Sequence, residues 1–459
     1  MEPEADEDYL HAADYSPYIS AFTSDDPPAR RYREFLEPQL RASLQHIVSD
    51  YFMTLFNLNI PISTADTITA PLLLVLVTDA AEFQQVKDNV SSIICGNREF
   101  DEYFITVSEG DYQELATRRY PFDFARERSY QNTFERGISI GYGKETATGG
   151  PLLVDGNGNC YTITCAHLFA NKAQNCIGLS VAQPSYQDYI DLHQTAKRYQ
   201  QNCKLRFDRV KPDDIENKQR ALDEANETFN KFDSIPHETI EDYDAASSVG
   251  KVVKSFCGTT LYMGRHCTSD YAIIKLERRL PEENEDFPED DVPTSGYLSS
   301  LTWANDPTTI GELQYDVYVK KRGRTTGTTH GLVAGIYGTF QRSRQIRQEF
   351  WVLPEALFST LYAFSDHGDS GSCVWTADGK AIGIIFGAWI VTFDRPALLA
   401  VVDPRGKWDV ERIPSYRQKD GSIDMTGLVT RAVTRPIILV QSLRMILQDS
   451  HEELSLWVE

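Results

Sequence analysis

The chain has 459 residues, 41% of them hydrophobic, so it can bury a core and is too long for one compact domain. Its formal net charge of −22 argues against nucleic-acid binding, because contacts to phosphates need clustered Lys and Arg. The longest uninterrupted apolar run, residues 381–391, is too short to cross a bilayer. We therefore expect no nucleic-acid partner and no membrane insertion.

The first part of the chain is acidic: residues 1–29 hold eight carboxylates and no Lys or Arg. We expect this lead to be disordered. It has neither the basic nor the apolar region of a secretory signal, which predicts a cytoplasmic protein. The eight cysteines are spread thinly and form no CxxC pair, so we expect reduced thiols and no zinc site.

Residues 30–135 predict a small α/β accessory module. Apolar residues recur at helical spacing from residue 30 to about residue 56. A buried strand is expected at 70–79, an amphipathic helix at 81–95 and another strand at 102–110. Because this alternation contains no glycine-rich nucleotide loop, we expect a regulatory or packing role, with a regulatory protein as a partner that the module could bind.

From residue 136 to residue 459 the sequence predicts a mostly β domain. Many short β-rich segments are separated by Gly, Asn, Asp and Pro, a pattern typical of a sandwich or barrel. One polar stretch, residues 185–232, interrupts them and predicts an inserted helical hairpin. Residues 435–448 predict a helix that Pro436 opens.

The segment HGDSGSCVW, residues 367–375, carries the strongest chemical signal. The glycines around Ser370 allow a sharp turn that presents its hydroxyl group. The backbone N–H groups of Gly368 and Ser370 would then point at one oxygen and form an oxyanion hole. A glycine-rich turn that happens to contain a Ser is the alternative, so the tetrapeptide alone is only suggestive.

A Ser hydroxyl needs an imidazole base to become a nucleophile. Of the nine histidines, only His167 follows a strong apolar strand, in the segment YTITCAHLF. His367 stands three residues before Ser370 and cannot easily turn back onto it, and His266 is the weaker rival. We therefore expect His167 to be the general base.

An acidic residue must orient the imidazole, and the segment SDYAIIKL offers Asp270 ahead of a short apolar strand. Asp270 would accept the Nδ1 proton of His167 and stabilise the imidazolium. A turn Asp before a strand is common, and Asp242 and Asp244 in a polar loop are alternatives. The order His, Asp, Ser along the chain is that of chymotrypsin.

The motifs TCAH, DYAIIKL and GDSGS resemble the TAAH, DIALLKL and GDSGG motifs of the trypsin/chymotrypsin superfamily. The resemblance covers about residues 136–400, and within the superfamily the chain is most similar to intracellular fungal trypsin-like peptidases. It implies a chymotrypsin-like double β-barrel with the active site between the barrels. It also implies a polypeptide substrate and neither a metal nor an organic cofactor.

The chain departs from the secreted members in how its site would be assembled. Secreted zymogens are cut so that a new terminal amine pairs with the Asp before the catalytic Ser, which is Asp369 here. Bacterial relatives use a basic residue beside the GRTTG turn instead, which makes Lys321 and Arg322 the candidates. We expect the site to form without cleavage at Arg136.

The substrate pocket also differs from that of trypsin. Phe364 stands six residues before Ser370, where trypsin has an acidic residue, so we expect a shallow or apolar pocket. The segment GIIFG, residues 383–387, resembles the strand that pairs with the substrate backbone, and Gly387 is expected to leave the entrance open.

These patterns predict a trypsin-like serine endopeptidase in which His167, Asp270 and Ser370 are catalytic. Two alternatives use the same residues. One is a protease-fold regulatory or self-processing scaffold with little turnover of other proteins. The other is an esterase that acts on small molecules.

Overall fold

The computed structural model describes thirteen stretches of the chain: residues 18–61, 67–100, 102–113, 133–169, 176–207, 215–233, 235–237, 239–281, 303–304, 306–342, 344–354, 364–392 and 437–457. Most of the expected acidic lead lies outside these residues. Its last part does not follow the expectation of disorder, because Tyr18–Ser20 form a strand and a helix begins at Pro27.

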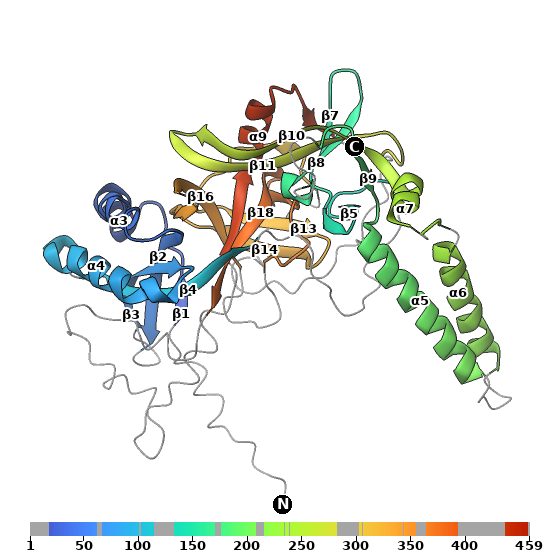
Figure 1. The fold of residues 1–459 in the computed structure, drawn as a ribbon, viewed down its shortest axis with the longest axis horizontal. Helices are drawn as coiled ribbons and strands as arrows, with labels where there is room; N and C mark the ends of the chain where they lie inside the picture. Colours follow the sequence, from blue (N-terminus) through green and yellow to red (C-terminus); the bar gives the residue numbers. More distant parts are fainter. Residues whose placement is uncertain are drawn as a thin grey trace, which may run out of the picture.

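The described residues are rich in β-structure and form two sheets (Figure 1). The first sheet has twelve strands: β1 (Tyr18–Ser20), β2 (Tyr51–Pro61), β3 (Thr67–Val77), β4 (Phe104–Gln113), β12 (Thr309–Ile310), β13 (Tyr318–Gly323), β14 (Gly327–Val333), β15 (Gly338–Arg342), β16 (Gln345–Pro354), β17 (Cys373–Thr376), β18 (Lys380–Thr392) and β19 (Ile437–Ser442). The second sheet has eight: β5 (Ser139–Tyr142), β6 (Glu145–Thr148), β7 (Leu152–Val154), β8 (Cys160–Thr164), β9 (Ser180–Ala182), β10 (Ser248–Tyr262), β11 (Arg265–Leu276) and β20 (Ser455–Leu456).

The described helices lie outside the sheets. They are α2 (Pro27–Arg31), α3 (Glu37–Leu44), α4 (Phe83–Gly96), α5 (Tyr186–Phe207), α6 (Ile215–Asp233), α7 (Ile240–Ser247) and α9 (Leu443–Ser450), with a π-helical turn at Tyr32–Leu36 and short 3₁₀ turns at Ala80–Glu82, Arg98–Phe100 and Ala166–Phe169. None of these helices combines the length and the apolar character that crossing a membrane requires.

The first 113 residues contain the expected β-α-β alternation. Strand β3 is buried along its apolar run, α4 buries Val86, Val90 and Ile94 on one face, and β4 lies parallel to β3. The spacing of the buried residues, four apart, is that of one helix face. A parallel pair of strands needs such a crossover helix, so the local pattern and the topology agree.

The helical pattern predicted up to residue 56 is wrong beyond α3. Helix α3 ends at Leu44, and Tyr51 begins strand β2. The residues from Tyr51 to Phe56 are all buried, so both faces of β2 are covered, and β2 also pairs with β3 on one edge and with β15 on the other. A run with aromatic residues that is buried on both sides favours a strand over an amphipathic helix.

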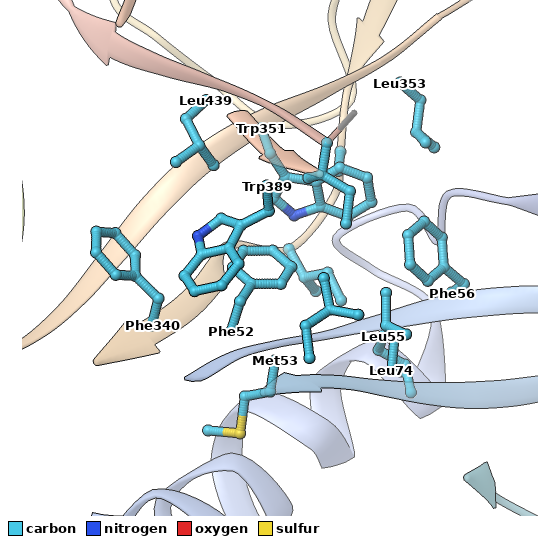
Figure 2. Packing of buried hydrophobic residues seen from close by; sticks show 14 of the residues in the cluster. Phe52, Met53, Leu55, Phe56, Leu74, Phe340, Trp351, Leu353, Trp389 and Leu439 are labelled. Atoms are coloured by element: carbon cyan, nitrogen blue, oxygen red, sulfur yellow. The ribbon is translucent and has the colours of Figure 1, made fainter. Parts of the chain in front are cut away.

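Strands from the first 113 residues extend the same sheet as strands from residues 309–442. Met53 of β2 is in register with Thr339 of β15, and Tyr112 of β4 is in register with Trp389 of β18. One hydrophobic core also includes residues from both of these parts of the chain, since the rings of Phe52 and Trp389 lie 5.6 Å apart (Figure 2). The expected boundary at residue 135 therefore does not separate two sheets or two cores.

Helices α5 and α6 pack side by side as a hairpin that projects from the body of the molecule (Figure 1). They occupy the stretch 185–232, in which the helical insert was expected. Tyr189, Leu192 and Ala196 of α5 are buried with Tyr243 of α7, where the hairpin joins the body.

The helix expected over residues 435–448 is wrong in its first half. Ile437–Ser442 form strand β19, which pairs with β16 and β18, and the helix α9 begins only at Leu443. Ser442 caps this helix, because its side chain accepts a hydrogen bond from the Met445 N–H group. The β-branched residues at the start of β19 are buried, as a central strand requires.

Candidate active site

The structure brings His167, Asp270 and Ser370 together. His167 Nδ1 is 2.6 Å from Asp270 Oδ2, and His167 Nε2 is 3.0 Å from Ser370 Oγ. Both distances are within hydrogen-bonding reach, although 103 and 203 residues separate the partners in the sequence. A hydroxyl, an imidazole and a carboxylate in this order can activate the hydroxyl as a nucleophile.

The two sheets share the three side chains. His167 lies in the 3₁₀ turn after β8, and Asp270 lies on β11, which pairs with β8. Ser370 lies in the turn that leads into β17 of the other sheet. The hydrogen bond between His167 and Ser370 therefore joins the sheets at one point.

Asp270 is held from several directions. Its Oδ1 accepts a hydrogen bond from the His167 N–H group at 3.0 Å, in addition to the contact of its Oδ2 with the ring. The Asp270 N–H group donates to Gln441 Oε1 at 2.9 Å, and Gln441 Nε2 donates to the Asp270 carbonyl. Gln441 on β19 was not predicted, since a Gln in a strand 171 residues away carries no sequence signal for this role.

The site is closed to solvent. Ser370 has no exposed surface, Asp270 is 3% exposed and His167 is 6% exposed. Electrostatic interactions inside such a site are stronger than in water.

The rival residues lie elsewhere in the fold. His266 is on β11 with an exposed side chain. Asp242 accepts a hydrogen bond from Thr239 at the start of α7, and Asp244 accepts one from the Gly143 N–H group at 3.3 Å. The ring of His167 contacts Asp270 and Ser370 instead.

Asp369 forms a buried ion pair with Lys321. The Nζ–Oδ2 distance is 2.8 Å, and neither side chain has exposed surface. Thr325 N–H and Thr326 Oγ1 each donate to the carboxylate at 2.7 Å. Burial by itself would raise the pKa of Asp369, but the charge of Lys321 and these hydrogen bonds lower it below its usual value. Of the two candidate partners for Asp369, the structure therefore places Lys321 in contact.

Arg136 is not presented for cleavage. Its side chain is 8% exposed, forms an ion pair with Asp306 at 2.7 Å and donates to the Trp457 carbonyl at 2.9 Å. The following residue, Gly137, donates its N–H group to the Gly149 carbonyl. Asp369 already has its cationic partner in this uncut chain.

The predicted oxyanion residues lie in a turn whose conformation requires glycine. Gly368 has a φ of +96°, which L side chains rarely adopt. Thr148 fixes the turn, because its Oγ1 donates to the Gly368 carbonyl and its N–H group donates to the Ser370 carbonyl, both at 2.8 Å. No described residue accepts a hydrogen bond from the N–H groups of Gly368 and Ser370. The role of these two donors in holding an oxyanion stays a prediction.

An ion pair links this turn to the helical insert. Arg324 contacts both carboxylate oxygens of Asp188 on α5, with 2.7 Å from Nη2 to Oδ1, and both side chains are 3% exposed. A Cβ atom on Gly368 would collide with the Arg324 guanidinium group. Sequence reasoning missed Asp188, because nothing in a polar helix distinguishes one Asp from the others.

Phe364 lies in a hydrophobic core cluster. Its side chain is 2% exposed and packs in a core cluster with Val319, Val352 and Ile385. Its carbonyl accepts a hydrogen bond from Thr329 Oγ1 at 2.6 Å. The expectation that Phe364 lines the substrate pocket stays a prediction.

The space beside Gly387 that a side chain would occupy is filled. A Cβ atom there would lie 2.7 Å from Tyr112 Oη and 2.9 Å from Tyr112 Cε2. The Tyr112 ring is held by Arg342, whose guanidinium carbon is 4.6 Å from the ring centroid, and by Trp389 at 6.1 Å. The open entrance expected at Gly387 is thus occupied by a side chain from β4.

Beyond Gly387, strand β4 pairs with one edge of β18. Ala388 and Trp389 pair with Gln113 and Tyr112 on one side and with β19 on the other. Nearer Ser370, the Ile385 N–H group donates to the Ser372 carbonyl. Between these points, Phe386 and Gly387 are the only residues of β18 that no described strand pairs with on the edge facing β17 and β4.

A metal ion is a poor fit for the three central side chains. Cys165, His167 and Asp270 offer ligand atoms within 4.8 Å of one another, and all three residues are buried. However, both ring nitrogens of His167 are engaged, one by Asp270 and the other by Ser370. Cys165 Sγ donates to the Ile385 carbonyl at 3.2 Å, and none of the eight cysteines, all of which lie in described residues, forms a disulfide.

No family model and no curated protein matches the chain. Solved structures that it resembles include a glutamic-acid-specific serine protease, with 14% identity over 70% of this chain and 99% of that one and a TM-score of 0.31. Thermobifida fusca protease A has 13% identity over 71% and 98%, with a TM-score of 0.32. Nocardiopsis protease has 11% identity over 70% and 98%, with a TM-score of 0.34. Similarity at this identity and TM-score does not establish an activity or a substrate, which have to be inferred from the geometry of the site.

Proposed function

We propose that the protein is a serine endopeptidase that hydrolyses peptide bonds through an acyl-enzyme. The observation that carries this proposal is the continuous contact from Asp270 through His167 to Ser370, at 2.6 and 3.0 Å. Three segments from two sheets converge to make it. The N–H groups of Gly368 and Ser370 add the second requirement of acyl transfer, a place for the developing oxyanion.

The first half-reaction forms an ester. Ser370 Oγ attacks the carbonyl carbon of the substrate while its proton passes to His167 Nε2. Asp270 holds the other ring nitrogen and stabilises the imidazolium. His167 then gives the proton to the leaving amine, the carbon–nitrogen bond breaks, and the acyl group stays on Ser370.

The second half-reaction uses water. His167 takes a proton from water, whose oxygen attacks the acyl carbon, and the proton returns to Ser370 Oγ as the ester bond breaks. Each oxyanion-hole donor contributes about 10²–10³-fold to the rate in such reactions. The pairing of Lys321 with Asp369 supports a site that assembles in the uncut chain.

A fluorophosphonate probe tests the proposal, because an activated Ser displaces fluoride and forms a covalent adduct. We expect one adduct per chain, located at Ser370 by peptide mass spectrometry and lost in Ser370→Ala and His167→Ala. Peptides from a proteome-derived library should be cleaved by the parent protein and not by Ser370→Ala. Absence of labelling in the parent, or labelling that survives Ser370→Ala, would refute the proposal.

The burial of Ser370 favours one alternative, a protease-fold scaffold that processes itself or regulates a partner protein with little turnover. In that case the small probe labels Ser370, but neither peptides nor proteins are turned over. An esterase acting on small molecules would turn over activated esters and not peptides. The same protein preparation, assayed with all three reagents, separates these outcomes.

A further inference from the structure

The helical insert carries a second cluster of side chains that can do chemistry, separate from the triad. His193 lies on α5, Asp233 is the last residue of α6, and His237 lies in the segment between α6 and α7. Each residue offers one ligand atom, and these atoms lie within 4.8 Å of one another. The cluster joins three elements of the insert at one point.

The distances suit a small metal ion. Two metal–ligand bonds of about 2.1 Å that meet at a tetrahedral angle place their ligand atoms about 3.4 Å apart. His193 Nε2 and Asp233 Oδ1 are 3.2 Å apart. The Asp233 side chain is 55% exposed, so its carboxylate can rotate to adjust its distances to the two imidazoles.

The imidazole of His237 is held in the state that a metal ligand needs. Its Nδ1 lies 2.6 Å from the Ile235 carbonyl and 2.9 Å from Tyr189 Oη. When Nδ1–H donates to a carbonyl, the neutral ring keeps its lone pair on Nε2. Metal-binding histidines characteristically donate their second nitrogen in this way, which fixes both the tautomer and the ring orientation.

The second imidazole is packed beside the first. The rings of His193 and His237 are 4.8 Å apart, and the His193 ring is 5.3 Å from Phe229. The His193 side chain is 14% exposed. An ion pair would explain His193 beside Asp233, but it does not explain a second imidazole with a fixed tautomer at the same point.

We propose that His193, Asp233 and His237 bind a divalent transition-metal ion of the zinc class. Two imidazoles and one carboxylate suit zinc, cobalt, nickel or copper, whereas calcium and magnesium prefer an all-oxygen shell. Three protein ligands leave one position for water. The ion ties the end of α6 to α5, and α5 also carries Asp188, which holds Arg324 beside Gly368.

Zinc and cobalt titrations of the full chain test the site. They are carried out in a His167→Gln background, so that the cluster around the triad cannot contribute. Calorimetry is expected to give one equivalent of Zn²⁺ bound, and Co²⁺ is expected to give the visible absorption bands of a four-coordinate ion. Zn²⁺ should also raise the melting temperature of the protein, a readout that does not depend on activity.

Matched variants assign the ligands. Asp233→Asn and His237→Gln should each weaken Zn²⁺ binding at least tenfold, whereas His46→Gln, at an exposed His away from the insert, should leave it unchanged. Circular dichroism of the metal-free variants shows whether they are folded, and the exposed position of Asp233 makes Asp233→Asn the safest of them. Equal Zn²⁺ affinity in the parent and in a His193→Gln/His237→Gln variant, or no binding to the folded parent, would overturn the proposal.

Discussion

Lys321 and Asp369 form an ion pair of 2.8 Å in which neither side chain has any exposed surface. The pair fixes the residue directly before Ser370, and so it fixes the turn from which the hydroxyl is presented. Because the Lys321 side chain supplies the cation, a newly cut amino terminus is not needed to balance the Asp369 carboxylate.

Lys321→Met should unfold the protein more easily, because it leaves a buried carboxylate without its cation. Removing one partner of a buried ion pair costs about 3–5 kcal/mol. Denaturant unfolding followed by circular dichroism measures this loss. Lys320→Met is the matched control, since Lys320 lies over the Trp375 ring and is outside the pair. An unchanged unfolding free energy in Lys321→Met would show that the pair does not stabilise the fold.

Glu349 should make the protein less stable as the pH rises from about 4.5 to about 7. Burial raises the pKa of Glu349 from its ordinary value of 4.5 to about 7, although hydrogen bonds from Thr268 and the charge of Arg347 oppose the rise. A group with a raised pKa contributes its full stability below pH 4.5 and loses it by about pH 7, a change of about 3 kcal/mol.

Glu349→Gln removes this titration and keeps an acceptor for the Thr268 N–H group. The unfolding free energy of the variant relative to the parent should therefore rise between pH 4.5 and pH 7 and stay level above pH 8. Unfolding curves at each pH, measured on both proteins, give this difference. A difference that is constant over the range would contradict the raised pKa.

Gly368→Ala should lower kcat and leave KM nearly unchanged. The φ of +96° strains any L side chain, and the added Cβ atom would collide with Arg324, so the turn must shift and misdirect its N–H group. Loss of one oxyanion donor reduces kcat about 10²–10³-fold. Gly379→Ala is the control, because Gly379 also has a positive φ, of +75°, but lies in a turn after β17. Equal kcat values in both variants would argue against an oxyanion role for Gly368.

Substrate length on the amino-terminal side of the cleaved bond should matter little. Strand β4 already pairs with β18 at Ala388 and Trp389, so only a short stretch of substrate backbone can align there. In a peptide series, residues added beyond the second before the cleaved bond should change kcat/KM less than threefold. Tyr112→Ala should admit larger side chains at these positions, because the ring that meets Gly387 is gone. A tenfold gain with peptide length in the parent would show that β4 is displaced by substrate.

The sequence was sufficient to predict the residues that converge at the site, because each lies in a short motif with its own local geometry. His167 follows a strand, Ser370 sits among glycines and Asp270 precedes apolar residues, so a few neighbours define each of them. The sequence also identifies Lys321 as a candidate partner of Asp369, for the same reason. It does not distinguish Lys321 from Arg322, and only the ion pair in the structure does so.

The missed features depend on contacts between distant parts of the chain. Gln441 meets Asp270 across 171 residues, and the partner of Asp188 is 136 residues away. The strand at Tyr51 resembled a helix because both of its faces are buried.

Strand β4 is made early by the ribosome, and its partner β18 is made late. About 270 residues separate them, which at roughly 5–20 residues per second is a delay on the order of 15–50 s. During this interval the apolar β3–β4 pair has an unfilled edge that a chaperone can shield. Ser370 and Gln441 are also made after β4, so the contacts of His167 with Ser370 and of Asp270 with Gln441 form only once these later residues have been synthesised.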